Sequence, residues 1–379
     1  KFITPGLKIK GIFSFDRYSW SGVTRSKTPD LYQPATQRDE NGNLILNISS
    51  YGQQFLSTSE NNDWGNKATY VELNLNYERT FGKHQVEGLF LYKQFEESYD
   101  IVPYRRMGIA GRASYTYDNR YIAEFNFGYN GSENFAKGYR FGFFPSVAIG
   151  YLLSEEKFME PYKDTFSKIK FRGSFGLTGN DQLDGRRFAY QTTLGEDGTG
   201  YDWGTNGQYY HRNSRFEGDF GIPNLTWETV SKTNAGFELG LWNMIDFQVD
   251  YFFEHRYNIF MKRNNIPTSA GFRNTPWANY GKVNNQGIDL ALNVNKQINK
   301  DLYVGFRGSF TYAQNKIIEQ DEALGVMGTN RQRTGEKVNQ LFGLVDEGLF
   351  TFDDFQKDAN GDYLIAENGG YVVNEDIPT

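Results

Sequence analysis

The sequence offers few residues that could carry out catalysis or hold a metal ion. It contains no cysteine, which excludes a thiolate nucleophile, a thiolate metal site and a disulfide framework. The three histidines, His84, His211 and His255, are expected in a turn, a loop and a strand end, and their spacing matches neither a metal site nor a catalytic triad. We therefore expect no enzymatic activity, no metal and no other cofactor.

One short segment, Asp358-Ala359-Asn360-Gly361-Asp362, begins like a calcium-binding loop with alternating oxygen ligands. Such a loop needs Gly at its sixth position and Glu at its twelfth, but these positions are Tyr363 and Gly369. We interpret the segment as a hairpin turn around Asn360-Gly361, and Asn41-Gly42 predicts a second turn of the same kind.

Aromatic side chains in two long polar segments are the candidates for ligand binding. Flat apolar faces beside amide and carboxylate groups suit the stacking and hydrogen bonding that sugar rings or peptide side chains require. The alternative, that these aromatics pack the loops together or against a protein partner, stays open. The candidates are Tyr201, Trp203, Tyr209, Tyr210 and Trp227 in segment 179–228, and Phe272, Trp277 and Tyr280 in segment 257–285.

The elements that must position these residues are β-strands. Apolar and polar residues alternate with period two in about eleven segments, whereas helical periodicity is limited to a short stretch at 154–164. The predicted strands are 6–16, 68–79, 84–95, 107–117, 120–130, 146–153, 168–178, 229–241, 244–256, 286–296 and 302–313.

Charged residues gather on one face of these strands, and the other face is apolar. The third strand is the least regular, because Leu89 and Leu91 share the side of Lys93. Acidic and basic residues balance on the charged face, so it creates no strong field for ions of one sign and weakly favours a neutral or zwitterionic substrate. We assign this face to a water-filled lumen, where its charges would also grip a plug; its main residues are Lys8, Lys10, Glu72, Arg112, Glu124, Lys168, Lys170, Arg172, Glu238, Asp250, Asp289 and Arg307.

The lengths of the connections favour a transmembrane barrel over a soluble sandwich. Short links such as 80–83 and 118–119 alternate with long ones such as 21–67 and 179–228. Outer-membrane barrels have this pattern of tight periplasmic turns and long extracellular loops. Aromatics make up 17% of the chain, which excludes disorder, and no apolar stretch is long enough for a membrane-spanning helix. A net charge of −6 without a basic run argues against nucleic-acid binding.

The fold class is thus predicted to be all-β, an antiparallel transmembrane β-barrel in the outer membrane. Eleven strands is an odd number, and single-chain bacterial barrels have an even one, so we expect about half of a 22-stranded barrel. We assign 1–315 to barrel strands and their loops and 316–379 to a long extracellular segment leading to closing strands that this chain lacks.

Several stretches resemble the SusC/RagA-like TonB-dependent outer-membrane transporters of Bacteroidetes. They include GRASYTYDNRYIAEFNFGYNGSENF (111–135), FGFFPSVAIGYLLSEEKFM (141–159), KIKFRGSFGLTGND (168–181) and PNLTWETVSKTNAGFELGL (223–241). DYFFEHRYNIF (250–260) and NYGKVNNQGIDLALN (279–293) follow in the order typical of the family.

The resemblance implies import of oligosaccharides or peptides, a SusD-like surface lipoprotein as a lid, and energy from the TonB-ExbB-ExbD complex. It also implies an N-terminal plug and other N-terminal domains, which this sequence lacks. Two other functions stay open: a passive porin or surface-adhesive barrel, and a soluble all-β binding module.

Overall fold

The computed structural model describes residues 4–98, 102–205, 210–343, 348–367 and 369–374, with the side chains of 60–64 and 198 left aside. The chain forms two compact units, Lys1–Val338 and Asn339–Thr379. The first unit contains the sheet that dominates the protein. The assignment of 316–379 to an extracellular segment stays a prediction.

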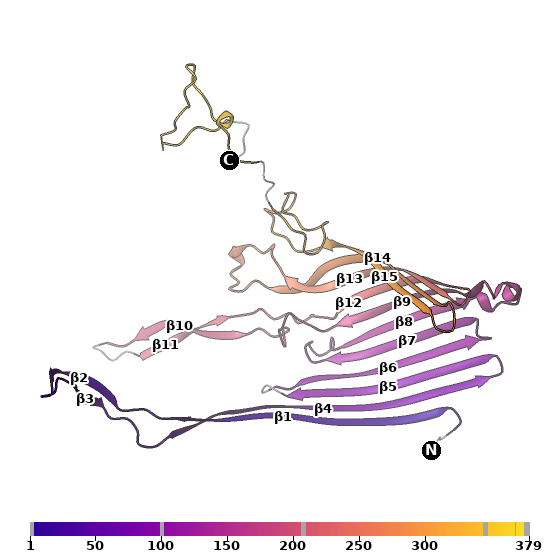
Figure 1. Ribbon diagram of the computed structural model, residues 1–379, viewed down its shortest axis with the longest axis horizontal. Helices are drawn as coiled ribbons and strands as arrows, with labels where there is room; N and C mark the ends of the chain where they lie inside the picture. The colour runs from indigo at the N-terminus through magenta and orange to yellow at the C-terminus, as the bar shows by residue number, and fades with distance from the viewer. Residues whose placement is uncertain (1–3, 99–101, 206–209, 344–347, 368, 375–379) are drawn as a thin grey trace. The chain divides into compact units, whose positions relative to one another are not determined.

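The first unit is built around one antiparallel sheet of eleven strands (Figure 1). Neighbours in the sheet follow the chain order β1, β4 to β9 and β12 to β15, as expected when antiparallel strands are joined by hairpins. The strands are β1 (Leu7–Ser26), β4 (Ser57–Phe81), β5 (His84–Ser98), β6 (Tyr104–Tyr117), β7 (Tyr121–Ser132), β8 (Phe141–Leu152), β9 (Phe166–Asn180), β12 (Glu228–Leu241), β13 (Ile245–Lys262), β14 (Trp277–Gln297) and β15 (Tyr303–Glu319).

Each of the eleven predicted segments corresponds to one strand, so the predicted sheet is confirmed. The lengths of β1 and β4 were underestimated at the end where the long connection 21–67 joins them: β1 continues to Ser26, and β4 begins at Ser57. Backbone pairing needs no apolar face, so the ladder continues after the alternation of side chains has ended. Within the described residues, the longest helical segment is the 3-10 turn η2 (Lys157–Tyr162), and none is long and apolar enough to cross a membrane.

Two further hairpins lie inside the long connections of the sheet, and the sequence analysis predicted the turn of the first one only. They are β2 (Leu31–Arg38) with β3 (Leu44–Ser50), and β10 (Leu194–Trp203) with β11 (Tyr210–Glu217). The first closes at Asn41-Gly42 as predicted, with Gly42 at a φ of +83°. The second was missed because Gly and Asp interrupt its alternation at 195–202.

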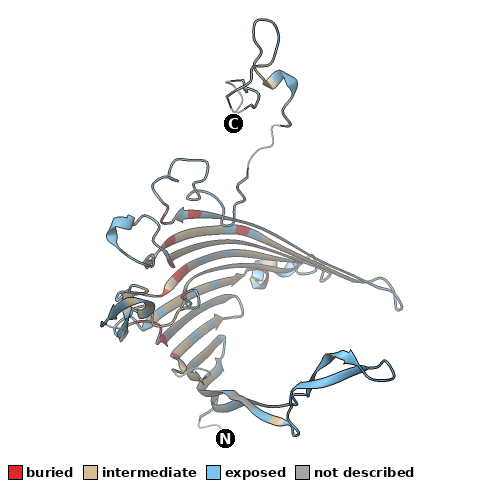
Figure 2. Ribbon diagram, turned by 90° about the vertical axis from the view of Figure 1, so that its left-hand side faces the viewer, coloured by how far each residue is buried: buried red, intermediate tan, exposed pale blue. Residues whose placement is uncertain are grey.

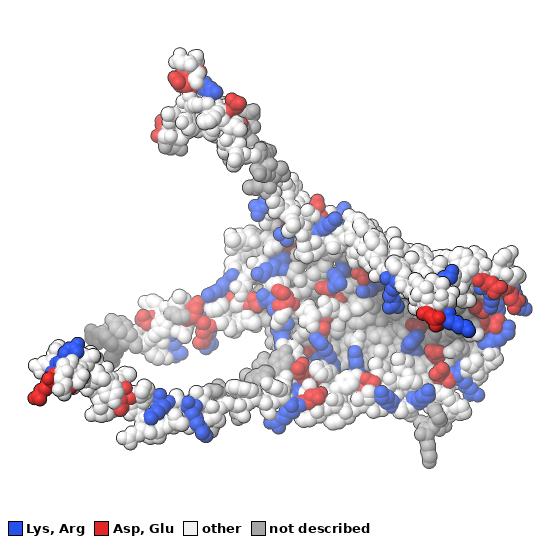
Figure 3. Space-filling model, in the orientation of Figure 1, with Lys and Arg blue, Asp and Glu red and all other residues white. Residues whose placement is uncertain are grey.

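The register places the charged residues together on one face of the sheet. Arg172, Gly236, Asp250 and Asp289 stand in one row across β9, β12, β13 and β14. In the next row of the apolar face, Phe171 pairs with Phe237, and Phe237 with Val249. Leu89 pairs with Arg112, which confirms that the third strand mixes apolar and charged residues. Figures 1 and 2 show the sheet curved about the strand direction, and Figure 3 looks onto its hollowed, charged side.

The short connections close at one end of the sheet with turns of a specific kind. Asp118 and Asn119 both have positive φ, and the Arg120 amide donates to the Tyr117 carbonyl oxygen at 3.0 Å. Such a type I′ turn matches the twist of antiparallel strands. Trp242-Asn243 repeats the same turn between β12 and β13. We call this the turn end of the sheet and the opposite end the loop end.

Burial in the sheet is the reverse of that in a soluble domain. Large apolar side chains are exposed along the uncharged face; Phe13 is 71% exposed and Ile149 69%. The few buried apolar residues gather mainly at the loop end, as the red segments in Figure 2 show. A continuous exposed apolar face of this kind needs lipid or protein to cover it.

The second unit is small and held by isolated β-bridges. Phe355 pairs with Val373, Lys357 with Tyr363, and Ile365 with Tyr371. Gly361 has a φ of +91°, which confirms the predicted turn at Asn360-Gly361. The Asn360 and Asp362 amides donate to one Asp358 oxygen at 2.8 and 3.0 Å, so this carboxylate caps a turn.

A pair of adjacent substitutions in β14 tests the assignment of the two faces. Leu290 lies on the apolar face opposite Val249 and Phe310. Leu290→Arg should lower the free energy of unfolding in a bilayer by about 2–4 kcal/mol, because the cation would face hydrocarbon. Asp289→Asn on the charged face should change it by less than about 0.5 kcal/mol. Urea unfolding in lipid vesicles measures both, and equal losses would contradict the assignment.

Candidate functional site

The charged face carries a network of ion pairs at its centre. Arg172 Nη2 lies 2.5 Å from Asp250 Oδ2, and Gln248 Nε2 donates to the same oxygen at 2.8 Å. Glu238 lies among Lys168, Lys170 and Arg172, with the last two at 3.8 and 3.5 Å. Asp250 is only 6% exposed, and burial of its charge is offset by these partners.

Side chains along the rest of this face also pair across strands. Arg112 donates twice to Glu124 Oε2, at 2.9 and 2.5 Å. Thr311 donates to Asp289 at 2.7 Å, and Arg307 to the Asn293 side chain at 2.9 Å. The predicted balance of charge is therefore organised into local pairs, which leaves a polar wall without one dominant sign.

Glu72 accepts a hydrogen bond from Tyr70. No ion pair is recorded for Lys8 or Lys10 within the described part of the chain, and both are exposed on β1. The contact between the charged face and a plug stays a prediction.

A buried aromatic cluster joins the loops at the loop end. Trp227 packs against Phe135, with 5.2 Å between ring centroids, and edge-on against Phe144 at 5.4 Å. Its indole nitrogen donates to the Arg140 carbonyl oxygen at 3.2 Å. Gly179 is required beside it, because a Cβ there would lie 2.0 Å from Phe144 Cζ. Trp227 is 8% exposed, so most of its side chain packs within this cluster, and a role for it in ligand binding stays a prediction.

Trp277 lies in the same region, and its indole ring contacts both an aromatic ring and an arginine side chain. Phe260 stacks on one side of the indole at 4.8 Å, and the Arg186 guanidinium lies 4.4 Å from the ring centroid. Tyr280 is covered in a similar way by Arg263 at 4.7 Å. Phe272 packs edge-on against Phe220 at 5.4 Å and is 43% exposed. The candidates Phe272, Trp277 and Tyr280 therefore all take part in contacts between or within loops.

Tyr201, Trp203 and Tyr210 are the most exposed of the described candidates. All three lie on the β10–β11 hairpin and are 57–66% exposed. Tyr201 and Trp203 pack edge-on at 5.0 Å, and Trp203 pairs with Tyr210 across the hairpin. Tyr209 lies outside the described residues. His211 bonds Asp202 at 2.7 Å, and nowhere in the described residues do three His, Asp or Glu side chains gather as a metal site would need.

A pocket of about 340 Å³ opens on the charged face near the loop end. Polar and aromatic groups are interleaved in it, and Arg106 is held by Asp181 at 3.1 Å. Its lining combines Tyr70, Lys93, Phe95, Arg106, Met107, Asn130, Gly131, Asp181 and Trp227. The sequence analysis missed this pocket because its residues come from separate strands and one loop; only the register brings them together.

Arginines that the sequence analysis did not single out tie neighbouring loops together. Arg187 donates to the Val102 and Pro103 carbonyl oxygens at 2.6 and 3.0 Å and to Glu133 at 2.7 Å. Arg263 donates to Asp321 at 2.8 Å. Burial alone would raise the pKa of Asp321, but the bonds from Arg263 and the Asn265 amide hold it below its usual value. The carboxylate thus stays charged at neutral pH and fixes the link after β15 to the 263–276 loop.

The fold is that of part of an antiparallel β-barrel wall, with one apolar face and one charged face. The model of the family described as TonB dependent receptor-like, beta-barrel, matches residues 7–372. The chain belongs to this family, whose members are receptors and transporters, and it is a protein of the outer membrane. This finding excludes the soluble-module alternative.

Individual relatives agree with this family. The chain is 29% identical to the TonB-dependent receptor SusC of Bacteroides thetaiotaomicron over 210 residues, 55% of this chain and 20% of that protein. It is 26% identical to TonB-dependent receptor P3 of Formosa agariphila over 265 residues, 66% of this chain and 25% of that protein. The chain thus spans about a quarter or less of these two relatives.

Solved structures share the fold. A chain of the RagAB peptide importer in its closed-closed state matches with a TM-score of 0.68 and 18% identity, over 98% of this chain and 43% of that chain. The outer-membrane transporter YddB of Escherichia coli matches with a TM-score of 0.50 and 8% identity, over 83% of this chain and 40% of that one. At these identities the likeness extends to the fold alone.

Two tryptophans in the same long connection should respond differently to truncation. Trp227→Ala should lower the free energy of unfolding by about 3–5 kcal/mol, because it leaves a cavity beside Phe135 and Phe144. Trp203→Ala, on the exposed hairpin, should change it by less than about 0.5 kcal/mol. Thermal or denaturant unfolding of both variants in the same detergent measures the difference. A similar loss of stability in both would contradict the distinction between the buried Trp227 and the exposed Trp203.

Proposed function

We propose that the full-length protein imports a nutrient too large for porins across the outer membrane, with energy from TonB. The observation that carries this proposal is the division of one barrel wall into a charge-balanced polar face and an uncharged apolar face, in a chain of this family. A polar wall with paired charges suits passage of a hydrated, neutral or zwitterionic solute. It would not select ions by sign.

The substrate class is an oligosaccharide or a peptide. Tyr201 and Trp203 present exposed rings on the β10–β11 hairpin, and the pocket around Arg106 and Asn130 combines aromatic faces with hydrogen-bonding groups. Such surfaces suit sugar rings and peptide side chains alike. One structural neighbour is described as a peptide importer, which supports a peptide as the substrate. The relative SusC supports the family assignment, but its name gives no substrate.

The proposed partners follow from the same family relation. A SusD-like surface lipoprotein would cover the loop end, and TonB with ExbB and ExbD would act through parts of the full-length protein outside this sequence. The exposed β2–β3 and β10–β11 hairpins extend from the loop end of the sheet (Figure 1) and supply surface for such a lid.

Uptake by cells that carry the full-length protein tests the proposal. Labelled peptide and oligosaccharide mixtures should enter in a TonB-dependent manner, and deletion of TonB should abolish uptake. Uptake that continues without TonB would favour the passive porin instead. Binding to the cell surface with no uptake would favour the adhesive barrel.

A double substitution on the hairpin tests the ligand-binding role of its rings. Tyr201→Ala with Trp203→Ala should weaken substrate binding about 5- to 150-fold, since each stacking contact contributes roughly 0.5–1.5 kcal/mol. Trp242→Asn is the control, because Trp242 is an exposed tryptophan at the turn end, where the positive φ suits Asn. Unchanged substrate affinity in the double variant, measured by calorimetry, would remove the hairpin from the binding site.

A further inference from the structure

A groove of about 720 Å³ interrupts the apolar face of the sheet. It forms because two small residues, Gly173 on β9 and Ala235 on β12, are paired with each other in the register. In the same row they are flanked by Ile149 and Tyr251, and in the next row by the rings of Phe171 and Phe237, 5.1 Å apart. We call this hollow the Gly173 groove. Its volume lies within the range of about 300–1,000 Å³ typical of ligand sites.

The groove lies in the half of the strands near the turn end. Tyr121, which also lines it, is the first residue of β7, and Phe237 stands four residues before the end of β12 at Leu241. Four residues of strand span about 13 Å. The apolar band of an outer-membrane barrel is about 25 Å tall, and its short turns face the periplasm. The groove therefore opens into the periplasmic leaflet.

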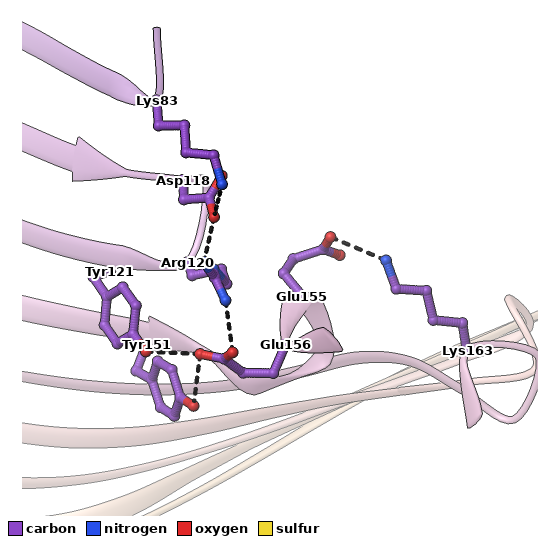
Figure 4. A network of polar contacts seen from close by, with 8 residues as sticks. All are labelled: Lys83, Asp118, Arg120, Tyr121, Tyr151, Glu155, Glu156 and Lys163. Atoms are coloured by element: carbon purple, nitrogen blue, oxygen red, sulfur yellow. Dashed lines mark hydrogen bonds and ion pairs between the residues drawn. The ribbon is translucent and has the colours of Figure 1, made fainter. Parts of the chain in front are cut away.

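A polar network adjoins the groove at the turn end (Figure 4). The hydroxyls of Tyr121 and Tyr151, two rings that line the groove, donate to Glu156 Oε1 at 2.7 and 3.2 Å. Arg120 Nη1 lies 2.6 Å from the other Glu156 oxygen, and Arg120 also pairs with Asp118, which Lys83 holds at 3.0 Å. The Tyr121 hydroxyl first, and Arg120 after it, hold the pKa of Glu156 below its usual value.

The 3-10 turn η2, which follows Glu156 directly, carries groups suited to the level of lipid headgroups. Phe158 and Tyr162 are 63% and 57% exposed. Lys163 is paired with Glu155 at 3.1 Å, whereas no ion pair or hydrogen bond is recorded for the Lys157 ammonium group among the described residues. Aromatic rings and lysines at the edge of an apolar band are typical of contact with headgroups and their phosphates.

We propose that the Gly173 groove binds one acyl chain of a glycerophospholipid from the periplasmic leaflet, with the lipid phosphate beside Lys157. The groove is continuous with the apolar face that lipid covers in an outer-membrane barrel, so acyl chains are the molecules that meet it first. Its lining offers apolar surface for a chain. Lys157 directly follows Glu156, which accepts hydrogen bonds from two lining tyrosines, and offers a positive charge for the phosphate.

Native mass spectrometry of the full-length protein, released from vesicles of phosphatidylethanolamine and phosphatidylglycerol, tests the proposal. The groove is filled by Gly173→Val with Ala235→Leu. A Cβ at Gly173 would lie 3.8 Å from Ile149 Cγ1, an ordinary contact, so the backbone there accepts a side chain. Ala123→Leu is the control, because Ala123 is an exposed small residue in the same row, one strand beyond Ile149.

The wild type and Ala123→Leu should retain a tightly bound phospholipid, and the filled variant should bind it at least about tenfold more weakly. If two methylene groups of the acyl chain lose their contact with the groove, the affinity falls by about this factor. Equal retention by all three proteins would overturn the proposal, as would the absence of a bound phospholipid from the wild type.

A second variant keeps the test decisive if the filled groove impairs folding. Lys157 lies on an exposed turn outside the strands, so its replacement should not disturb the sheet. Lys157→Gln should reduce the binding preference for phosphatidylglycerol over a neutral diacylglycerol by about threefold or more, as expected for the loss of one charge near a lipid surface. Lys163→Gln, which removes a lysine already paired with Glu155, should leave this preference nearly unchanged. Equal effects of the two variants would contradict the role of Lys157.

Discussion

The backbone hydrogen bonding of the sheet is the constraint on which the rest of this structure depends. A chain that crosses hydrocarbon must satisfy every peptide N–H and C=O within the protein, and β-strands do so only by pairing with neighbours. The unbroken antiparallel order of eleven strands meets this requirement through the interior of the sheet. Pairing also fixes which way each side chain points, since neighbours in register share a face. One face can then meet lipid while the other meets water.

The two ends of the sheet are stabilised in different ways. At the turn end, type I′ turns such as Asp118-Asn119 close hairpins in the fewest residues, and the network around Arg120 and Glu156 ties one turn to the 3-10 link. At the loop end, the strands continue beyond the apolar band, and buried rings around Trp227 with crossing arginines such as Arg187 hold the connections together. The proposed binding surface therefore lies on loops that the barrel wall supports.

Much of the wall could be predicted from the sequence. Period-two alternation depends only on neighbouring residues, so residues such as Asp289 and Leu290 reveal their opposite faces without knowledge of the fold. The position of each strand in the eleven-stranded sheet followed from the same pattern. The β10–β11 hairpin could not be found in this way, because an exposed hairpin buries neither face and imposes no alternation.

The site was harder to predict than the wall because contacts between distant segments decide it. Trp227 and Trp203 lie in the same connection and have the same chemistry, yet one is buried against Phe135 and the other is exposed. The pocket around Arg106 depends on the register of strands and on Asp181 from a separate loop. The Gly173 groove depends on two small residues that are far apart in sequence and adjacent in the sheet.

Fluorescence from single cysteines along β14 tests the central claim, the opposite environments of the two faces, most directly. This sequence has no cysteine. With any cysteine elsewhere in the full-length protein replaced, a polarity-sensitive dye can be attached in turn to Ile288→Cys, Asp289→Cys, Leu290→Cys and Ala291→Cys in bilayers. The account predicts emission that alternates, blue-shifted at 288 and 290 and red-shifted at 289 and 291. Emission that does not alternate, or that alternates in the opposite sense, would contradict it.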